Sequence, residues 1–218
     1  MITRHARGAD LLRHRHTDAY VAVVLTGGYV EAGDGGRWRA RPGTVIVHDC
    51  YEAHRDHFED SMTTVLNLPL GTGLAAGAGR IDDVDAVVRL AETDRHAAAE
   101  LMARCWTAGA EALVDWPDLL AADLRADRAP DLRRWADRHG LNPASVSRGF
   151  ARAYGVSPKR YRLEARARHA WQALRAGALS LADVAAAHGF ADQPHLTRAL
   201  TALTGTTPGR IRAKSVQA

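Results

Sequence analysis

The sequence is poor in cysteine and in long apolar runs, and each shortage excludes a class of protein. Only two cysteines occur, Cys50 and Cys105, so a disulfide framework is excluded. No apolar run approaches the roughly 18 residues that a membrane-spanning helix needs. The opening residues MITRH show no apolar signal segment. We therefore expect a cytoplasmic protein without a membrane partner.

What the chain does contain is enough for a folded core, with its charge divided unevenly. The 218 residues are 46% hydrophobic and 25% charged, and the net charge is +4. Residues 1–114 contain 12 Lys and Arg against 16 Asp and Glu, a net charge of −4. Residues 115–218 contain 17 against 9, a net charge of +8. A basic half of this kind suits a polyanion such as nucleic acid, so we expect the two halves to have different partners.

Short runs rich in β-branched residues, separated by turn residues, dominate the first third of the chain. Tyr20–Thr26 stops at two glycines, and Asp34-Gly35-Gly36 is typical of a hairpin turn. From Arg13 to about Pro69 the pattern predicts six or seven strands, and therefore an all-β sandwich or barrel. The glycine-rich stretch 71–79 predicts a flexible break. Beyond it the apolar spacing predicts two helices, at Asp82–Leu90 and from Asp94 to about Leu113.

The C-terminal half repeats itself. Shifting the chain by fifty residues places Gly155 on Gly205 and Pro158 on Pro208. The same shift also pairs Val146 with Leu196, Arg148 with Arg198, Phe150 with Leu200, Arg160 with Arg210, Tyr161 with Ile211 and Arg162 with Arg212. One structural unit therefore occurs twice.

Each unit has the pattern of a helix-turn-helix. In the first, Asp131–His139 predicts a short helix that ends at Gly140, because glycine adopts a positive φ most easily. Asn142 is then a natural N-cap for a second helix that runs to about Tyr154. The second unit repeats this plan with helices at Leu181–Ala187 and Gln193–Leu203.

The outward positions of the two second helices carry side chains that recognise bases. Arginine grips guanine at O6 and N7, glutamine suits adenine, and threonine contacts the thymine methyl group. We predict base contacts from Ala144, Ser147, Arg148, Gln193, Thr197 and Arg198, and phosphate contacts from Arg152, Lys159, Arg160 and Arg210. The alternative is a plain helical bundle with solvated polar faces. The repeated glycine corners, the repeated outward arginine and the +8 charge all weigh against that alternative.

Residues 116–212 resemble the DNA-binding domain of the AraC-type (AraC/XylS) transcription regulators. The resemblance is carried by LADVAAAHGF at 181–190, by Leu196-Thr197-Arg198 and by Gly205-Thr206-Thr207-Pro208, with Trp135–Arg162 matching the first unit. It implies an all-α domain of seven helices over residues 115–214, in which a long helix at Lys159–Ala176 joins the two helix-turn-helix units. It also implies two recognition helices that enter successive segments of the major groove.

The N-terminal strands resemble a small cupin-type barrel, the usual sensor module of this family, over residues 1–72. The residues that carry the resemblance are His14-Arg15-His16, Tyr20, Gly27, Pro42-Gly43 and His54. Metal cupins have the pattern His-x-His-x3-Glu and a later His, so the resemblance implies a divalent metal on His14, His16 and His54. Tyr20 stands where the carboxylate ligand is usual. Cys50, His48 and His57 lie close enough in the sequence to substitute.

The opposing interpretation of the barrel is an organic-ligand pocket lined by Tyr20, Tyr29 and Trp38. Both interpretations give the same overall function: a sequence-specific DNA-binding transcription regulator that responds to a small ligand or metal and has no catalytic activity. Two alternatives remain open. One is a small metal cupin enzyme with an appended DNA-binding domain, which the missing glutamate opposes. The other is a barrel that serves only for oligomerisation.

Residues 80–114 occupy the place of the linker and dimerisation helices in relatives of this kind. Their apolar stripe either joins two copies of the chain or packs onto the barrel of the same copy. We expect a homodimer, since paired half-sites multiply affinity. The other expected partners are double-stranded DNA, the effector and RNA polymerase.

Overall fold

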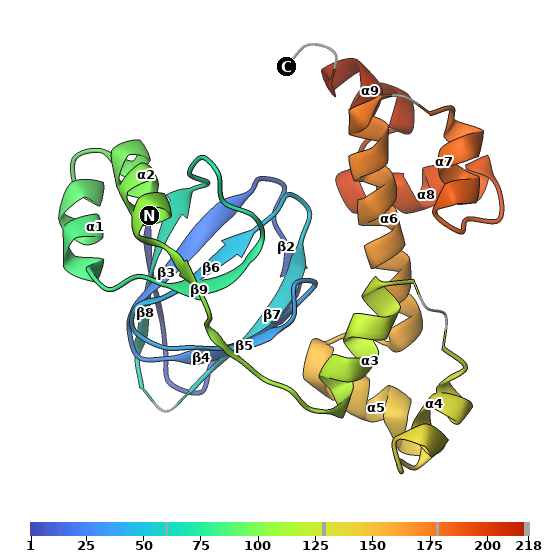
Figure 1. Ribbon diagram of the computed structural model, residues 1–218, viewed down its shortest axis with the longest axis horizontal. Helices are drawn as coiled ribbons and strands as arrows, with labels where there is room; N and C mark the ends of the chain where they lie inside the picture. The colour runs from blue at the N-terminus through green and yellow to red at the C-terminus, as the bar shows by residue number, and fades with distance from the viewer. Residues whose placement is uncertain (60, 128–129, 178, 216–218) are drawn as a thin grey trace. The chain divides into compact units, whose positions relative to one another are not determined.

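The computed structural model describes residues 1–59, 61–127, 130–177 and 179–215 (Figure 1). The chain divides into two compact units. One contains Met1–Asp118 with Ala153–Gly155, and the other contains Leu119–Arg152 with Val156–Ala218. Among the described residues no helix is both long and apolar enough to cross a membrane.

The first unit is built from two antiparallel sheets. The larger has the order β1-β8-β3-β6-β9-β10, and the smaller has the order β11-β5-β4-β7-β2. The strands of the larger sheet are β1 (Ile2–His5), β8 (Thr63–Pro69), β3 (Tyr20–Thr26), β6 (Thr44–His48), β9 (Gly77–Arg80) and β10 (Thr107–Ala108). Those of the smaller are β11 (Glu111–Ala112), β5 (Arg37–Ala40), β4 (Tyr29–Gly33), β7 (Ala53–Phe58) and β2 (Asp10–Arg15).

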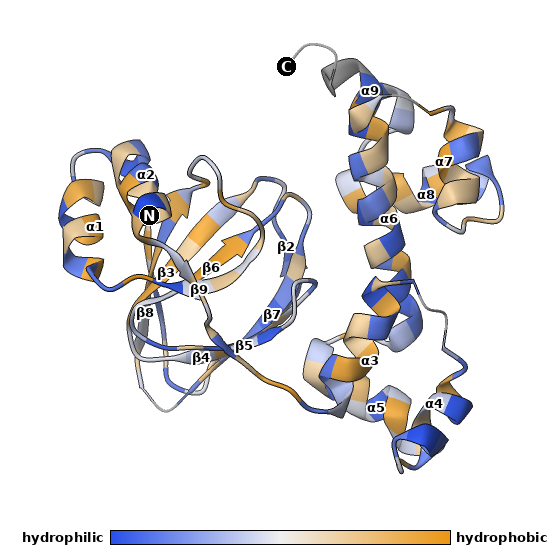
Figure 2. Ribbon diagram, in the orientation of Figure 1, coloured by the Kyte–Doolittle hydropathy of each residue, from blue (hydrophilic) through white to orange (hydrophobic). Residues whose placement is uncertain are grey.

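Strand β3 is apolar along its whole length because both of its faces are covered. Ala22 and Val24 point into a cluster shared with Tyr29 and Phe58 of the smaller sheet. Val21 and Val23 point the other way, into a second cluster that includes residues of helices α1 (Val84–Ala91) and α2 (Arg95–Cys105). A strand buried on both faces reads as a continuous hydrophobic run rather than an alternating one. Figure 2 shows the contrast with β7, which is mostly hydrophilic.

The helices α1 and α2 bury their apolar stripe against the sheet of their own unit. Val87, Ala98 and Met102 are at most 2% exposed and pack with the valines of β3 and β6. Of the two roles predicted for this stripe, the structure therefore assigns it to packing within one copy of the chain. A homodimer remains a prediction and would need another surface.

Two sequence predictions for residues 71–113 are wrong. The stretch predicted as a flexible break contains β9, which pairs with β6. The helix predicted to run to about Leu113 ends at Cys105, and the chain then forms β10 and β11. A Cβ on Gly79 would lie 2.3 Å from the backbone oxygen of Thr107, so glycine is needed where β10 approaches β9. Strand pairing thus overrides the helix propensity of an Ala-rich segment.

The helices that follow are α3 (Trp116–Arg125), α4 (Leu132–Arg138), α5 (Pro143–Tyr154), α6 (Pro158–Ala176), α7 (Leu181–Ala187), α8 (Gln193–Thr204) and α9 (Pro208–Ser215). The long helix α6 packs against α7, α8 and α9. Phe150 of α5 meets Tyr161 of α6 edge to face, with ring centroids 5.4 Å apart, and both side chains are buried. The bounds predicted for α4 to α8 agree with the observed ones to within a residue or two.

Candidate DNA-binding surface and effector cavity

The corner of the first helix-turn-helix unit forms as its sequence predicts. Asp131 caps α4 by accepting a hydrogen bond from the backbone N–H of Arg134. Gly140 has a φ of 65°, and the N–H of Leu141 then donates to the carbonyl of Ala136 at 2.9 Å. This is how a left-handed residue closes a helix and turns the chain. Asn142 starts α5 by accepting from the N–H of Ala144.

The second unit repeats this corner bond for bond. Gly189 has a φ of 68°, and the N–H of Phe190 donates to the carbonyl of Ala185 at 2.9 Å. Asp192 then caps α8 through the N–H of His195. The turn from glycine to cap is one residue longer than in the first unit, because Ala191 precedes Asp192. The two units therefore end their first helix in the same way and differ by one residue in the turn that follows.

The residues predicted to contact bases lie on the exposed faces of α5 and α8. Ala144, Ser147, Arg148, Gln193 and Arg198 are exposed, and Thr197 is half-buried. The opposite faces of these helices are buried through Val146, Phe150, Leu196 and Leu200. Each second helix is thus anchored by its apolar face and presents polar side chains outward.

The residues predicted to contact phosphates all lie on the surface. Arg152, Lys159 and Arg210 are exposed. Arg160 is exposed as well, but its Nε lies 2.8 Å from Oε1 of Glu164 one turn along α6. Sequence reasoning overlooked a further basic group on α4, where Arg133, Arg134 and Arg138 are all exposed. Their spacing along a short amphipathic helix was the signal that could have revealed them.

Two other arginines of α6 have a structural role. Arg162 and Arg166 hold Oδ1 of Asp127 at 2.8 and 2.7 Å. Partial burial alone raises the pKa of Asp127, but hydrogen bonds from Arg166 and Arg162 outweigh it and hold the pKa below its ordinary value. Arg166 also donates to the carbonyl of Gly189, at the corner of the second unit.

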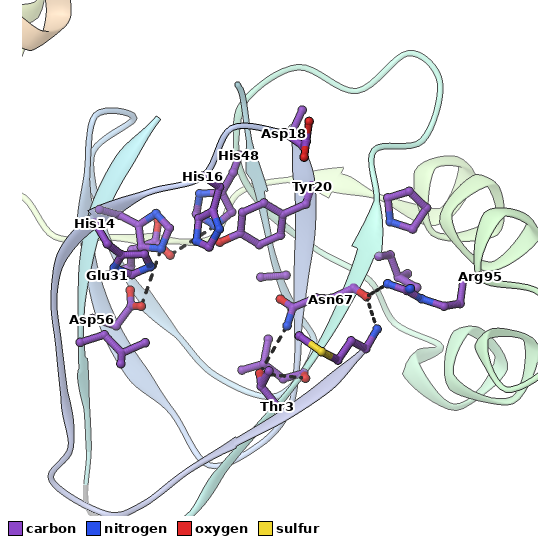
Figure 3. Close-up of a pocket in the computed structure, with 18 of the residues that line it drawn as sticks. Thr3, His14, His16, Asp18, Tyr20, Glu31, His48, Asp56, Asn67 and Arg95 are labelled. Carbon is purple, nitrogen blue, oxygen red and sulfur yellow. Dashed lines mark hydrogen bonds and ion pairs between the residues drawn. The ribbon is translucent and has the colours of Figure 1, made fainter. Parts of the chain in front are cut away.

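The first unit contains a cavity of about 1020 Å³ between its strands and the start of α2. Figure 3 shows His14, His16, His48, Glu31 and Asp56 gathered at one end, with Asn67 and Arg95 at the other. Apolar side chains complete the lining, among them Leu11, Tyr29, Phe58, Val65 and Leu68. The cavity therefore combines a polar, imidazole-rich end with an apolar body.

The structure brings together the three histidines predicted as metal ligands. His14 of β2 lies directly opposite His54 of β7 in the register of the smaller sheet. His16 follows one residue after β2 ends, and its ring is 5.0 Å from that of His14. One donor nitrogen from each of the three rings lies within 4.8 Å of the other two.

A second, more deeply buried group shares His54. Oε2 of Glu31 lies 3.6 Å from Nε2 of His48, and donor atoms of Glu31, His48 and His54 all lie within 4.8 Å of one another. These three side chains are 2–4% exposed. Within the described residues, both ring nitrogens of His48 and Nδ1 of His54 have no hydrogen-bond partner. Of these residues, sequence reasoning named His48 only as a substitute and missed Glu31.

Burial sets the protonation of this end of the cavity. Loss of solvation lowers the pKa of His48 to about 3, with the nearby His16 and His14 adding to the effect, and it lowers that of His54 further. The same cause raises the pKa of Asp56 to about 7 and that of Glu31 well above its ordinary value. Neutral imidazole is the form that ligates a metal, so the residues present fit a divalent ion that prefers nitrogen ligands.

The predicted pocket aromatics separate into two groups. Tyr20 and Tyr29 line the cavity, and the ring of Tyr20 stacks on that of His48 at 4.5 Å. Trp38 is not among the lining residues, because it packs at the edge of the core cluster instead. The other suggested substitutes lie elsewhere: His57 is exposed beside Asp10, and Cys50 is not part of the lining.

Known proteins resemble this chain over its C-terminal region. A family model described as a helix-turn-helix domain matches residues 135–214. A transcriptional regulator with an AraC-type DNA-binding domain from Chromobacterium violaceum is 25% identical, with 45% of this chain and 89% of that chain covered and a TM-score of 0.41. The C-terminal domain of AraT, a response regulator from Geobacillus stearothermophilus, is 18% identical, with 47% and 87% covered and a TM-score of 0.42.

ToxT from Vibrio cholerae is similar over the whole chain. It is 8% identical, with 98% of this chain and 97% of that chain covered and a TM-score of 0.42. No curated protein matches the chain. The match over residues 135–214 agrees with the two helix-turn-helix corners described above. Residues 135–214 are accordingly an AraC-type helix-turn-helix domain, and an all-β unit precedes it in the chain.

Proposed function

We propose that this chain is a DNA-binding transcription regulator of the AraC type that senses a divalent metal ion, held in the cavity of its N-terminal unit by His14, His16 and His54. The observation that carries the proposal is the convergence of three imidazoles from two strands, with donor atoms within 4.8 Å of one another. Imidazole suits Zn, Ni, Cu or Fe. Within the described residues, the ring nitrogens of His48 and Nδ1 of His54 have no hydrogen-bond partner that would compete with an ion. An ion bound there would act as a cross-link between β2 and β7.

The DNA is read by α5 and α8. Arg148 and Arg198 grip guanines, Gln193 suits adenine, and Thr197 contacts a thymine methyl group, while Ala144 and Ser147 allow close approach of α5. Lys159 and Arg210 hold phosphates at the starts of α6 and α9, with further phosphate contacts from Arg152 and Arg160. The exposure of these faces and the +8 charge of residues 115–218 support this assignment.

The test measures metal content and DNA affinity on the same full-length protein. The chain is dialysed against Zn²⁺, its bound metal is measured by elemental analysis, and its affinity for a duplex selected from a random library is measured by fluorescence anisotropy. We expect about one bound ion per chain and a DNA affinity that changes on chelation.

The matched variants are His16→Ala and His57→Ala. His16→Ala is expected to lose both the bound metal and the effect of metal on DNA affinity. His57→Ala removes an exposed histidine outside the cavity and is expected to behave as the unmodified chain. Metal-free protein after dialysis, or full metal content in His16→Ala, would contradict the metal proposal.

A second candidate effector is an organic molecule in the body of the cavity. The observation that favours it is size, since about 1020 Å³ matches the pockets of about 300–1,000 Å³ that hold small organic ligands. The apolar lining of Leu11, Tyr29 and Phe58 also suits such a ligand. This candidate predicts protein without bound metal and a His16→Ala variant whose regulation is normal.

A further inference from the structure

The metal site proposed above lacks a carboxylate at the position where the sequence pattern expects one. Tyr20 occupies it, and a phenol is a far weaker acid than a carboxyl group, so it is the poorer source of an anionic ligand. An ion held by three neutral imidazoles alone would keep its full double charge beside the buried ring of His54. The structure contains a carboxyl group that can compensate for this charge, on a different strand.

Glu31 projects from β4 and His48 from β6, and both face the cavity beside His54. Their donor atoms lie within 4.8 Å of each other and of the His54 donor. Donors on one zinc ion lie about 3.3 Å apart when Zn–N bonds are near 2.0–2.1 Å, so shifts of about an ångström would bring this group to bonding distance. His54 belongs to both groups, so an ion bound beside its ring would lie next to the side chains of both.

We propose that Glu31 and His48 are ligands of the same metal centre, so that the site consists of His14, His16, His48, His54 and Glu31. This inference rests on the metal-sensing function proposed above and adds the inner half of its ligand set. A carboxyl group loses its proton when it binds a metal ion, so Glu31 would supply the anionic ligand that Tyr20 does not.

The unpartnered nitrogens of the buried histidines are an independent observation in favour of a ligand at this position. His48 is 2% exposed, and within the described residues neither of its ring nitrogens has a hydrogen-bond partner. Buried polar groups are nearly always paired, and each exception needs an explanation. The Glu31 carboxyl at 3.6 Å is close enough to share an ion with His48 and too far for a good hydrogen bond.

The number of donors also bears on what the centre does. Catalytic metal sites keep a position open for water or substrate, whereas structural sites are closed by protein ligands. Five protein donors drawn from β2, β4, β6, β7 and the residue after β2 would leave no open position on a four- or five-coordinate ion and only one on a six-coordinate ion. The centre would then respond to the presence of the ion itself, which is what a metal sensor requires.

The experiment is a titration of the full-length chain with Zn²⁺ by calorimetry, and with Co²⁺ by visible absorption. The variants are Glu31→Gln and His48→Gln, which keep the size of the side chain, and His16→Ala for the outer group. Controls are His57→Ala and Glu52→Gln. Glu52 is another buried carboxylate, but it accepts a hydrogen bond from the backbone N–H of Asp49 and does not line the cavity.

We expect Glu31→Gln and His48→Gln each to weaken Zn²⁺ binding by at least about 100-fold, beyond the roughly 10- to 100-fold loss caused by removing a residue that only orients a ligand. Each should also change the position and intensity of the Co²⁺ d–d bands, because these depend on the number and type of ligands. The two control variants should leave affinity and spectrum unchanged.

Unmodified affinity and spectrum in both Glu31→Gln and His48→Gln would overturn this inference. If, in the same experiment, His16→Ala still lost the metal, the metal-sensing function would stand with His14, His16 and His54 as the ligands. Weaker binding by Glu31→Gln and His48→Gln with an unchanged Co²⁺ spectrum would also overturn the inference that these residues are ligands. Glu31 and His48 would then only position the true ligands. A chain that binds neither ion would overturn both proposals and favour the organic effector.

Discussion

Arg148 provides the sharpest test of the DNA-reading face. It is exposed on α5, and within the described part of the chain no ion pair or hydrogen bond restrains its guanidinium group. Reading a guanine therefore breaks no bond inside the protein, and the full value of a bidentate base contact is available. We expect Arg148→Ala to cost about 1–3 kcal/mol on the selected operator, or about 5- to 150-fold in Kd, and much less on random duplex.

Lys159 and Arg160 are the comparison for a contact that carries no sequence information. Lys159→Ala should weaken specific and random DNA alike and reduce the slope of log affinity against log salt by about 0.9. Arg160→Ala should have a smaller effect, because its guanidinium already pairs with Glu164, and an exposed pair of this kind is worth about 0.3–0.5 kcal/mol. These affinities are measured by fluorescence anisotropy at several salt concentrations.

Comparing the loss of affinity on operator and on random DNA decides whether Arg148 contacts a base or a phosphate. Equal losses on operator and random DNA for Arg148→Ala would show that Arg148 holds a phosphate. If Arg198→Ala behaved in the same way, the predicted faces of both recognition helices would be wrong.

Two further predictions concern stability, both measured by urea unfolding. Gly79→Ala places a Cβ 2.3 Å from the Thr107 oxygen and should destabilise the N-terminal unit by about 1–3 kcal/mol; an unchanged midpoint would refute the close approach of β9 and β10. Asp127 has a lowered pKa, so its contribution is complete above its ordinary value of about 3.9 and is lost as the pH falls through the folded value. Asp127→Asn should therefore lower stability at neutral pH and flatten the decline below about pH 4, and a variant that declines as steeply as the unmodified chain would contradict this.

The helix-turn-helix units could be predicted from sequence because their signals are local. Gly140 and Gly189 end helices through a backbone conformation that other residues resist, and Asn142 and Asp192 cap the next helix a few residues on. Such features depend on neighbours within one turn of the chain. They also occur twice, so each unit served as a check on the other.

Residues 71–112 could not be predicted in the same way. The segments 77–80, 107–108 and 111–112 are strands only because they pair with β6, with β9 and with β5, respectively. Alone, the segment 94–113 has the composition of a helix, and only its first part keeps that structure. Information of this kind lies in contacts between residues distant in the sequence, which a local pattern does not contain.

Glu31 illustrates the same limit at the cavity. The sequence pattern directed attention to the position four residues after His16, where Tyr20 stands, and the absence of a carboxylate there argued against a metal. The structure brings a carboxyl group to the histidines from β4, because β4 pairs with β7 and places Glu31 opposite Asp56, two residues from His54. A ligand set depends on which side chains share a cavity, and several strands can supply the same chemical group. The missing glutamate is therefore weak evidence against a metal, and the decisive observation becomes whether removing the Glu31 carboxylate changes the affinity of the chain for Zn²⁺.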